Sequence, residues 1–324
     1  MALSKFTSPS SDRHRLSAQA PPFICKHSSP ASSLVDFFSC LCGKMYLQSV
    51  RTSVPLSDYI KRIATTETVP LPGYPHLQRS VLTEQVQQLM RRVLALMPDP
   101  ENNIKCLSKL KAENVRVEVA TGRPFLHAVS WTWYSDNLAK KNYARVGEIF
   151  RETIFNGALD SLPLDFQELL KLMGTMEHMA SYAVQHHCSL VWAVDKKELF
   201  ARVYDFANDI LQKWDYSSYT DVMNGLKFPQ YWHILIQKNP YLDMFFRGST
   251  YNPGSGKEVL RFKRNTYIHC LQHAWDVTTR QQMYDQADMG ELLETVLPLV
   301  LHSFQLELDK RGLLRNIALM SLFQ

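Results

Sequence analysis

Apolar residues recur every three or four positions through most of the chain beyond residue 80, and this spacing restricts the fold more than any other feature. It places seven apolar side chains on one face of a helix over residues 80–97, and seven more on one face over 196–214. Because the 324 residues include only 12 glycines, architectures built from many tight turns are disfavoured. We therefore expect a mainly α protein, an irregular multi-helix bundle whose helices could divide into two lobes.

Proline, glycine and capping residues set the expected ends of the helices. The one convincing strand pattern is Val115, Val117 and Val119 alternating with charged residues, and Pro124–Tyr134 is its expected partner. At most a minor β-hairpin is therefore predicted near 115–130. A short helix at 57–64 and an extended connector to Pro75 precede the body. Further helices are predicted at 80–97, 99–111, 136–156, 163–192, 196–214, 217–226, 230–238, 258–286 and 289–310.

Composition divides the chain into four parts. Residues 1–33 are rich in serine and proline and poor in apolar residues, so we expect a disordered basic tail there. An organellar transit peptide has a similar composition, and translation could start at Met45 instead of Met1. The other parts are a docking segment and proline-rich connector at 34–79, an N-terminal helical lobe at 80–214, and a C-terminal helical lobe at 215–324.

The net charge of +5 is unevenly distributed along the chain. Residues 1–35 hold four of the 36 basic residues and one of the 31 acidic residues, which leaves 32 against 30, or +2, for the rest. A nearly neutral body indicates that any affinity for nucleic acid comes from the tail or from local patches. No run approaches the roughly 18 apolar residues of a membrane span. Six scattered cysteines and the lack of an apolar signal-peptide segment indicate an intracellular protein, cytoplasmic or in a virion.

The motifs of common chemistries are incomplete in this chain. Residues 252–257 match a phosphate-binding loop only in part, because a tyrosine replaces its first glycine and an acid replaces the hydroxyl residue that binds Mg²⁺. His269 and His273 share a helix face, but Cys270 replaces the glutamate of a zinc-protease motif. A solvated polar face is expected there, with a zinc or regulatory site as the alternative. We expect no catalytic residue, no metal and no cofactor, and a protein that is not an enzyme.

Basic and aromatic residues cluster in two stretches, around residues 131–151 and 257–267. Cationic side chains neutralise phosphates and aromatic faces stack on unpaired bases, so this mixture favours single-stranded RNA as a ligand. The alternative is that the aromatic residues belong to the core and the cations to solvated helix faces. The predicted phosphate contacts are Lys140, Lys141, Arg145, Arg151, Arg261, Lys263 and Arg264, and the predicted stacking residues are Trp131, Trp133 and Tyr267.

The hypothesis that follows is a non-enzymatic RNA-binding structural protein of the nucleocapsid type. It would bind single-stranded RNA without strong sequence preference, and it would self-associate through the apolar patch at Leu34–Leu41. This hypothesis requires the two basic stretches to face one cleft. One alternative is a helical protein-interaction or scaffold module with a targeting tail. Another is an enzyme or ligand-binding protein, which a deep pocket with converging titratable groups would favour.

Overall fold

A computed structural model describes residues 52–98, 105–175, 181–247, 250–273 and 284–323, and the fold is described for these ranges. Within them 60% of the residues are helical, and the strands form a few small antiparallel sheets. The prediction of a mainly α fold with minor β-structure is thus confirmed. None of the described helices is both long and apolar enough to cross a membrane.

The helices of the first half follow the predicted apolar stripes but are shorter. Thr83 and Ser135 begin two of them, since each side-chain oxygen accepts a hydrogen bond from the backbone N–H three residues later. The segment predicted as a helix at 163–192 is helical at 164–175 and 181–185 and ends before residue 192, while residues 176–180 lie outside the described ranges. The helices are α2 (Leu56–Ile60), α3 (Glu84–Leu94), α4 (Asp136–Ile149) with a π-helical turn at Phe150–Ile154, α5 (Leu164–Thr175) and α6 (Ser181–Gln185).

The helices of the second half cover most of the predicted segments. Two predicted boundaries are wrong: Asp285 caps α13 instead of belonging to the helix at 258–286, and the helix predicted at 289–310 is two helices. Pro298 lacks an N–H, and Leu299 has a φ of 66°, so the helix is interrupted at these two residues and α13 and α14 are separate. The helices are α7 (Lys196–Asp205), a π-helical turn (Phe206–Leu211), α8 (Gln212–Trp214), α9 (Tyr216–Gly225), α10 (Trp232–Gln237), α11 (Pro240–Arg247), α12 (Gly256–His269), α13 (Gln286–Val296) and α14 (Val300–Asp309). Short 3₁₀ turns lie at Ala112–Asn114, Cys188–Leu190, Ala193–Asp195, Cys270–His273, Leu314–Asn316 and Met320–Leu322.

The hairpin predicted near 115–130 is present. Strand β5 (Val115–Glu118) pairs antiparallel with β6 (Arg123–Leu126), and β1 (Ser53–Pro55) pairs with the other edge of β5. A second pair joins β4 (Lys105–Leu107) to β7 (Trp131–Trp133). The helix predicted at 99–111 is therefore wrong over β4, while residues 99–104 lie outside the described ranges. The Asn142 side chain bonds the backbone N–H and C=O of Leu107, both at 3.0 Å, so tertiary contacts override the local pattern.

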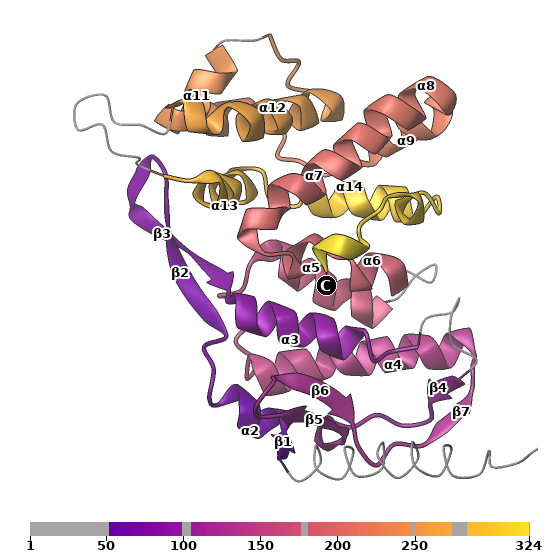
Figure 1. Ribbon diagram of the computed structural model, residues 1–324. Coiled ribbons are helices and arrows are strands. Elements are labelled where there is room, and N and C mark those ends of the chain that lie inside the picture. The colour runs from indigo at the N-terminus through magenta and orange to yellow at the C-terminus, as the bar shows by residue number, and fades with distance from the viewer. Residues whose placement is uncertain (1–51, 99–104, 176–180, 248–249, 274–283, 324) are drawn as a thin grey trace, which may run out of the picture. The chain divides into compact units, whose positions relative to one another are not determined.

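A longer hairpin was not expected from the sequence. Strands β2 (Thr66–Leu71) and β3 (Tyr74–Leu82) replace the predicted extended connector, and they turn through Pro72 and Gly73. Gly73 has a φ of 76°, and a Cβ there would lie 2.6 Å from the Asn239 side chain, so both conformation and space require glycine. In Figure 1 the hairpin extends from the region beside α3 to α13.

The described core consists of two apolar clusters. One is built around α3, α4 and α5, with Tyr143, Phe150 and Phe166 fully buried. The other is built around α7 and α9–α14, with Trp232, Phe262 and Phe304 fully buried. His187 is buried. The division of the body into lobes at residue 214 stays a prediction.

Candidate nucleic-acid interface

Strand β7 exposes two tryptophan rings. Trp131 is 48% exposed and Trp133 is 75% exposed. The two residues are separated by one position in a strand, so their side chains leave the same face of the β4–β7 pair. Lys105 lies directly opposite Trp133 in the register and is also exposed. This short ribbon therefore presents two aromatic faces next to a cation.

Helix α4 lies beside this ribbon and carries further cations. Its Asn142 bonds Leu107 in β4, which fixes the helix beside the ribbon. Lys141 is exposed and Lys140 is partly exposed. Within the described ranges, no carboxylate lies within ion-pair distance of Lys105, Lys140 or Lys141. We call these three lysines with Trp131 and Trp133 the Trp–Lys surface.

The other two predicted cations near α4 differ in their surroundings. Arg145 forms an ion pair with Glu148, at 2.6 Å between Nη1 and Oε2, but such an exposed pair contributes little and leaves other guanidinium donors unused. Arg151 is exposed at the π-helical turn that ends α4. The two arginines lie beyond the lysines along the helix and can add to its positive potential.

The second predicted cluster is corrected by the structure. Lys263 is fully buried in α12, where its ammonium pairs with Glu294 and lies 5.7 Å from the ring centre of Phe200. Tyr267 is buried beside it, and its ring is tilted against that of Phe200 with 5.6 Å between ring centres. A buried cation is retained because its partner compensates the lost hydration. Neither side chain is accessible to a polynucleotide, so neither belongs to an RNA-binding surface.

The remaining cations of α12 do not meet those of α4. Arg261 bonds Glu258 at 2.8 Å and lies over the Tyr251 ring, while Arg264 is exposed beside Tyr204. Helix α12 packs in the second core cluster against α7, α11 and α13, whereas α4 packs in the first against α5 and β4. Figure 1 shows α13, α14, α5 and α3 between these two helices. The expectation that both basic stretches face one cleft is therefore wrong.

Lys105 and the nearby Lys109, which is also exposed, were not among the predicted site residues. A signal was present, because residues 105–111 contain three lysines and no acid. The predicted helix at 99–111 hid it, since only strand pairing brings Lys105 opposite Trp133.

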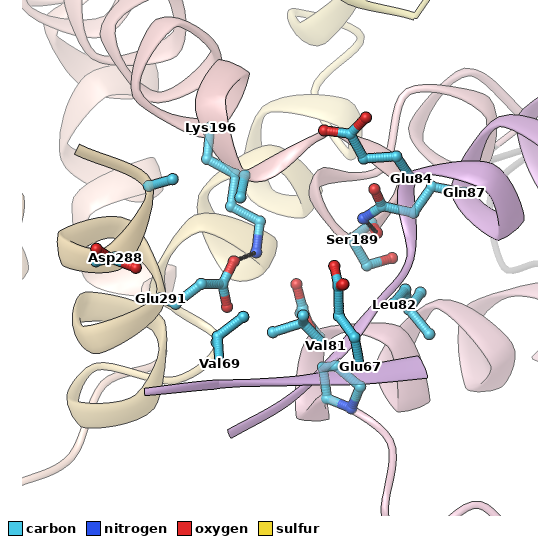
Figure 2. Close-up of a pocket in the computed structure, with 14 residues that line it drawn as sticks. Glu67, Val69, Val81, Leu82, Glu84, Gln87, Ser189, Lys196, Asp288 and Glu291 are labelled. Carbon is cyan, nitrogen blue, oxygen red and sulfur yellow. Dashed lines mark hydrogen bonds and ion pairs between the residues drawn. The ribbon is translucent and has the colours of Figure 1, made fainter. Parts of the chain in front are cut away.

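A separate pocket of about 100 Å³ contains converging charged groups (Figure 2). It lies between the β2–β3 hairpin and the N-terminal ends of α3, α5, α7 and α13. Lys196 points across it to Glu291, at 2.7 Å, and Arg79 approaches the other oxygen of this carboxylate at 3.2 Å. Burial alone would raise the pKa of Glu291, but the two cations outweigh it and lower that pKa.

Most of the charged side chains that line this pocket have a structural role. Glu84, Asp165 and Asp288 each lie in the first turn of a helix, where the positive end of the helix dipole favours a carboxylate. Burial raises the pKa of Asp165, and the nearby Lys196 and Arg79 offset this only in part. The volume is below the roughly 300 Å³ at which pockets for organic ligands begin. We interpret Arg79, Lys196 and Glu291 as a buried ion-pair network that joins the hairpin to α13.

Among the described residues, no group of three or more His, Cys, Asp or Glu side chains could hold a metal ion. His269 is exposed and its Nδ1 lies 3.2 Å from the Gln272 amide oxygen, while the side chain of His273 lies outside the description. The solvated polar face expected at this position stays a prediction, and so does the zinc alternative.

The chain was compared with known proteins. It matches no protein-family model and no curated protein sequence. Inferences about function therefore depend on the surfaces described above.

Proposed function

We propose that the protein binds single-stranded RNA on the Trp–Lys surface, without strong sequence preference. The observation that supports this most directly is the pair of exposed tryptophans on one face of β7, with Lys105 opposite Trp133 in the strand register and without an acidic partner in the described ranges. Large aromatic side chains usually bury most of their surface in a folded protein. Two rings exposed side by side among cations are typical of a stacking platform for bases.

The geometry favours unpaired bases over a duplex. Residues two apart in a strand are about 7 Å apart, so the two rings can stack on separate bases. Each stacked base contributes about 1–3 kcal/mol, and every base has a face that can stack, which makes the contact tolerant of sequence. Lys105, Lys140 and Lys141 would neutralise phosphates, so the affinity should fall steeply as salt is added.

In this proposal the protein is a non-enzymatic structural RNA-binding protein of the nucleocapsid type. Self-association through Leu34–Leu41 remains part of it, although that segment lies outside the described ranges. An intracellular location is proposed with it. The scaffold alternative would use the same exposed rings to bind a protein, so the two hypotheses are separated by whether RNA binds at all.

The test is the affinity of the full-length protein for a fluorescein-labelled uridine oligonucleotide, measured by fluorescence anisotropy at low salt. Replacing both rings (W131A/W133A) should weaken binding at least about 25-fold, because two stacking contacts of at least about 1 kcal/mol each are lost. The matched control is W214A, which removes an exposed tryptophan from α8, outside the surface. This variant should bind like the wild type.

A charge-reversal pair tests the cationic half of the surface. K140E/K141E should abolish binding at moderate salt and reduce the slope of log affinity against log salt, because two phosphate contacts are lost. K238E is the control, since Lys238 is an exposed lysine outside the surface. Absence of binding by the wild-type protein at low salt, or an equal loss in W214A and W131A/W133A, would reject the proposal.

A further inference from the structure

Helix α3 carries a buried cation, Arg91, that has no acidic partner in the described ranges. Arg91 is only 6% exposed, because the helical spacing turns it toward the core together with Gln87, one turn earlier. The Gln87 amide is satisfied, since it donates to the carbonyls of Ser189 and Val191. No described carboxylate lies within ion-pair distance of the Arg91 guanidinium. A buried charge without a partner is costly, so Arg91 differs from the paired Lys196 and Lys263.

The guanidinium of Arg91 uses one of its three nitrogens within the described ranges. Nη1 donates to the Leu322 carbonyl at 3.1 Å, whereas Nε and Nη2 are buried without an acceptor. Nε and Nη2 carry the two parallel N–H groups on one edge of the guanidinium plane. The two oxygens of a carboxylate match this edge and can accept both bonds at once. Since nearly all buried donors in folded proteins are hydrogen-bonded, the edge indicates a site for an acceptor.

Other contacts hold this guanidinium in place. Its carbon Cζ lies 4.9 Å from the ring centre of Trp192, which is a cation–π distance. Burial lowers the pKa of Arg91, and the charge of Asp195 opposes this shift. The arginine nevertheless stays protonated, because the pKa of a guanidinium is far above neutral. The site therefore presents one fixed positive charge in a defined orientation.

A pocket of about 120 Å³ adjoins Arg91 where the C-terminal turn meets α3 and α6 (Figure 1). Its volume exceeds the roughly 15 Å³ that one water needs, and it is below the roughly 300 Å³ of pockets for larger organic ligands. Only an anion of a few atoms can fit. Arg91 is the one lysine or arginine among its described lining residues, so a single negative charge would balance it. The other described lining residues are Ala95, Gln185, His186, Met320 and Phe323.

We propose that this pocket binds a small monocarboxylate, about the size of propionate, whose two oxygens accept hydrogen bonds from Nε and Nη2 of Arg91. The short apolar chain of the ligand would lie against Met320 and Phe323. Because both nitrogens are covered, the carboxylate would reach them after a rotation of the Met320 side chain, which is 59% exposed and has three rotatable bonds. Phosphate is a poorer ligand, since it carries up to two negative charges against one cation. This site goes beyond the proposed RNA binding and uses no residue of the Trp–Lys surface.

The test is isothermal titration calorimetry of the full-length protein with sodium propionate. The wild type should bind one propionate with a dissociation constant of about 10 µM to 1 mM, the range for a ligand of so few atoms. Propionamide has the same shape without the charge and should not bind. Inorganic phosphate should bind at least about tenfold more weakly than propionate, because its second charge has no partner in the pocket.

Two substitutions of Arg91 separate its charge from its geometry. R91M removes the guanidinium and keeps an unbranched side chain, so it should abolish propionate binding. R91K keeps the charge but loses the parallel N–H pair, so it should weaken binding at least about tenfold. The matched control is R92M, since Arg92 bonds the carbonyls of Thr121 and Gly122 and does not line the pocket. This variant should bind propionate like the wild type.

A third variant tests the pocket without changing Arg91. Ala95 is exposed and lines the pocket, so the ring of A95F should obstruct it without disturbing the core and should abolish propionate binding. Circular dichroism of each variant checks that the fold is intact, and R91K with A95F decide the question if R91M does not fold. RNA affinity should be unchanged in A95F, so failure of the carboxylate site and failure of RNA binding are distinguishable.

Four results would overturn the proposal. They are absence of propionate binding by the wild type, equal binding of propionamide, phosphate binding as tight as that of propionate, and unchanged propionate binding in R91K or A95F. The last result would place the ligand elsewhere on the protein, and Arg91 would then only anchor the C-terminal turn through Leu322.

Discussion

Replacing one of two buried histidines should change how the stability of this protein depends on pH. His187 and His302 are both buried, and His187 Nε2 lies 2.7 Å from His302 Nδ1. The Nδ1 atom of His187 accepts from the Ser189 N–H at 3.2 Å, so its Nε2 carries the proton and donates to His302. Protonating His302 at Nδ1 would place two N–H groups against each other in the core.

The size of the expected change in the free energy of unfolding follows from the pKa of His302. Burial, which is the largest cause, lowers this pKa from 6.5 to about 4; Glu168 opposes the shift, and Lys227 adds to it. Burial also lowers the pKa of His187, and the charge of His302 lowers it further. The unfolded chain binds the proton of His302 more tightly than the folded chain does. The stabilisation that neutral His302 contributes to the fold is therefore complete above pH 6.5, and it is lost progressively as the pH falls to 4. Between pH 7.5 and pH 5 the loss is about 2 kcal/mol in the free energy of unfolding.

The experiment must separate the loss of stability caused by His302 from an opposing gain caused by Asp309. Burial raises the pKa of Asp309 from 3.8 to about 6, so this carboxyl gains a proton in the folded state over the same interval and stabilises the fold as the pH falls. The informative quantity is therefore the difference between the wild type and H302Q, whose amide oxygen can still accept from His187. Urea unfolding at pH 7.5 and pH 5, followed by circular dichroism, gives each free energy.

The wild type should lose about 2 kcal/mol more than H302Q over this interval. H76Q is the control, because His76 is exposed, and it should follow the wild type at both pH values. If the wild type and H302Q change by the same amount within about 0.5 kcal/mol, the histidine pair does not titrate as the structure indicates.

Further expectations concern buried polar contacts, and urea unfolding checks each one. E294Q should destabilise the fold by about 3–5 kcal/mol, because it leaves the buried Lys263 ammonium without a charged partner. The double variant K263M/E294L should recover most of this loss, and a double variant as unstable as E294Q would contradict the argument. N239A should cost about 2 kcal/mol, since it removes the cap of α11 and the bond to Pro72 together; a change below about 0.5 kcal/mol would show that the hairpin turn holds its position without this bond.

The helices could be predicted from the sequence because their determinants are local. Apolar spacing located α3 and α4, and the side-chain caps at Thr83 and Ser135 account for their starts. The β2–β3 hairpin and strand β4 could not be predicted in the same way. Each depends on a partner brought by the fold, α13 for the hairpin and Asn142 for β4. Prolines also obscured β2 and β3, which tolerate them because each strand has an unpaired edge.

Only part of the candidate site could be predicted, because residue type is visible in the sequence and strand register is not. Trp131, Trp133, Lys140 and Lys141 were identified by type; Lys140 is partly exposed and the other three are exposed. Lys263 was counted as a surface cation, although it shares a helical stripe with Val259, Phe262 and Thr266, all of them buried. The position of Lys263 in this stripe predicts a buried side chain. Lys105 required knowledge of strand register, which local patterns do not provide.

The β2–β3 hairpin has a consequence for synthesis of the chain. Arg79 in β3 donates to the backbone oxygen of Glu291, which lies 212 residues further along the chain. At about 5–20 residues per second, a ribosome needs roughly 10–40 s to make the intervening segment. During that interval the hairpin has emerged without the helix that it binds, and its unpaired edges are open to other chains. A ribosome-associated chaperone that covers short β-edges would therefore raise the yield of folded protein more than one that acts after release.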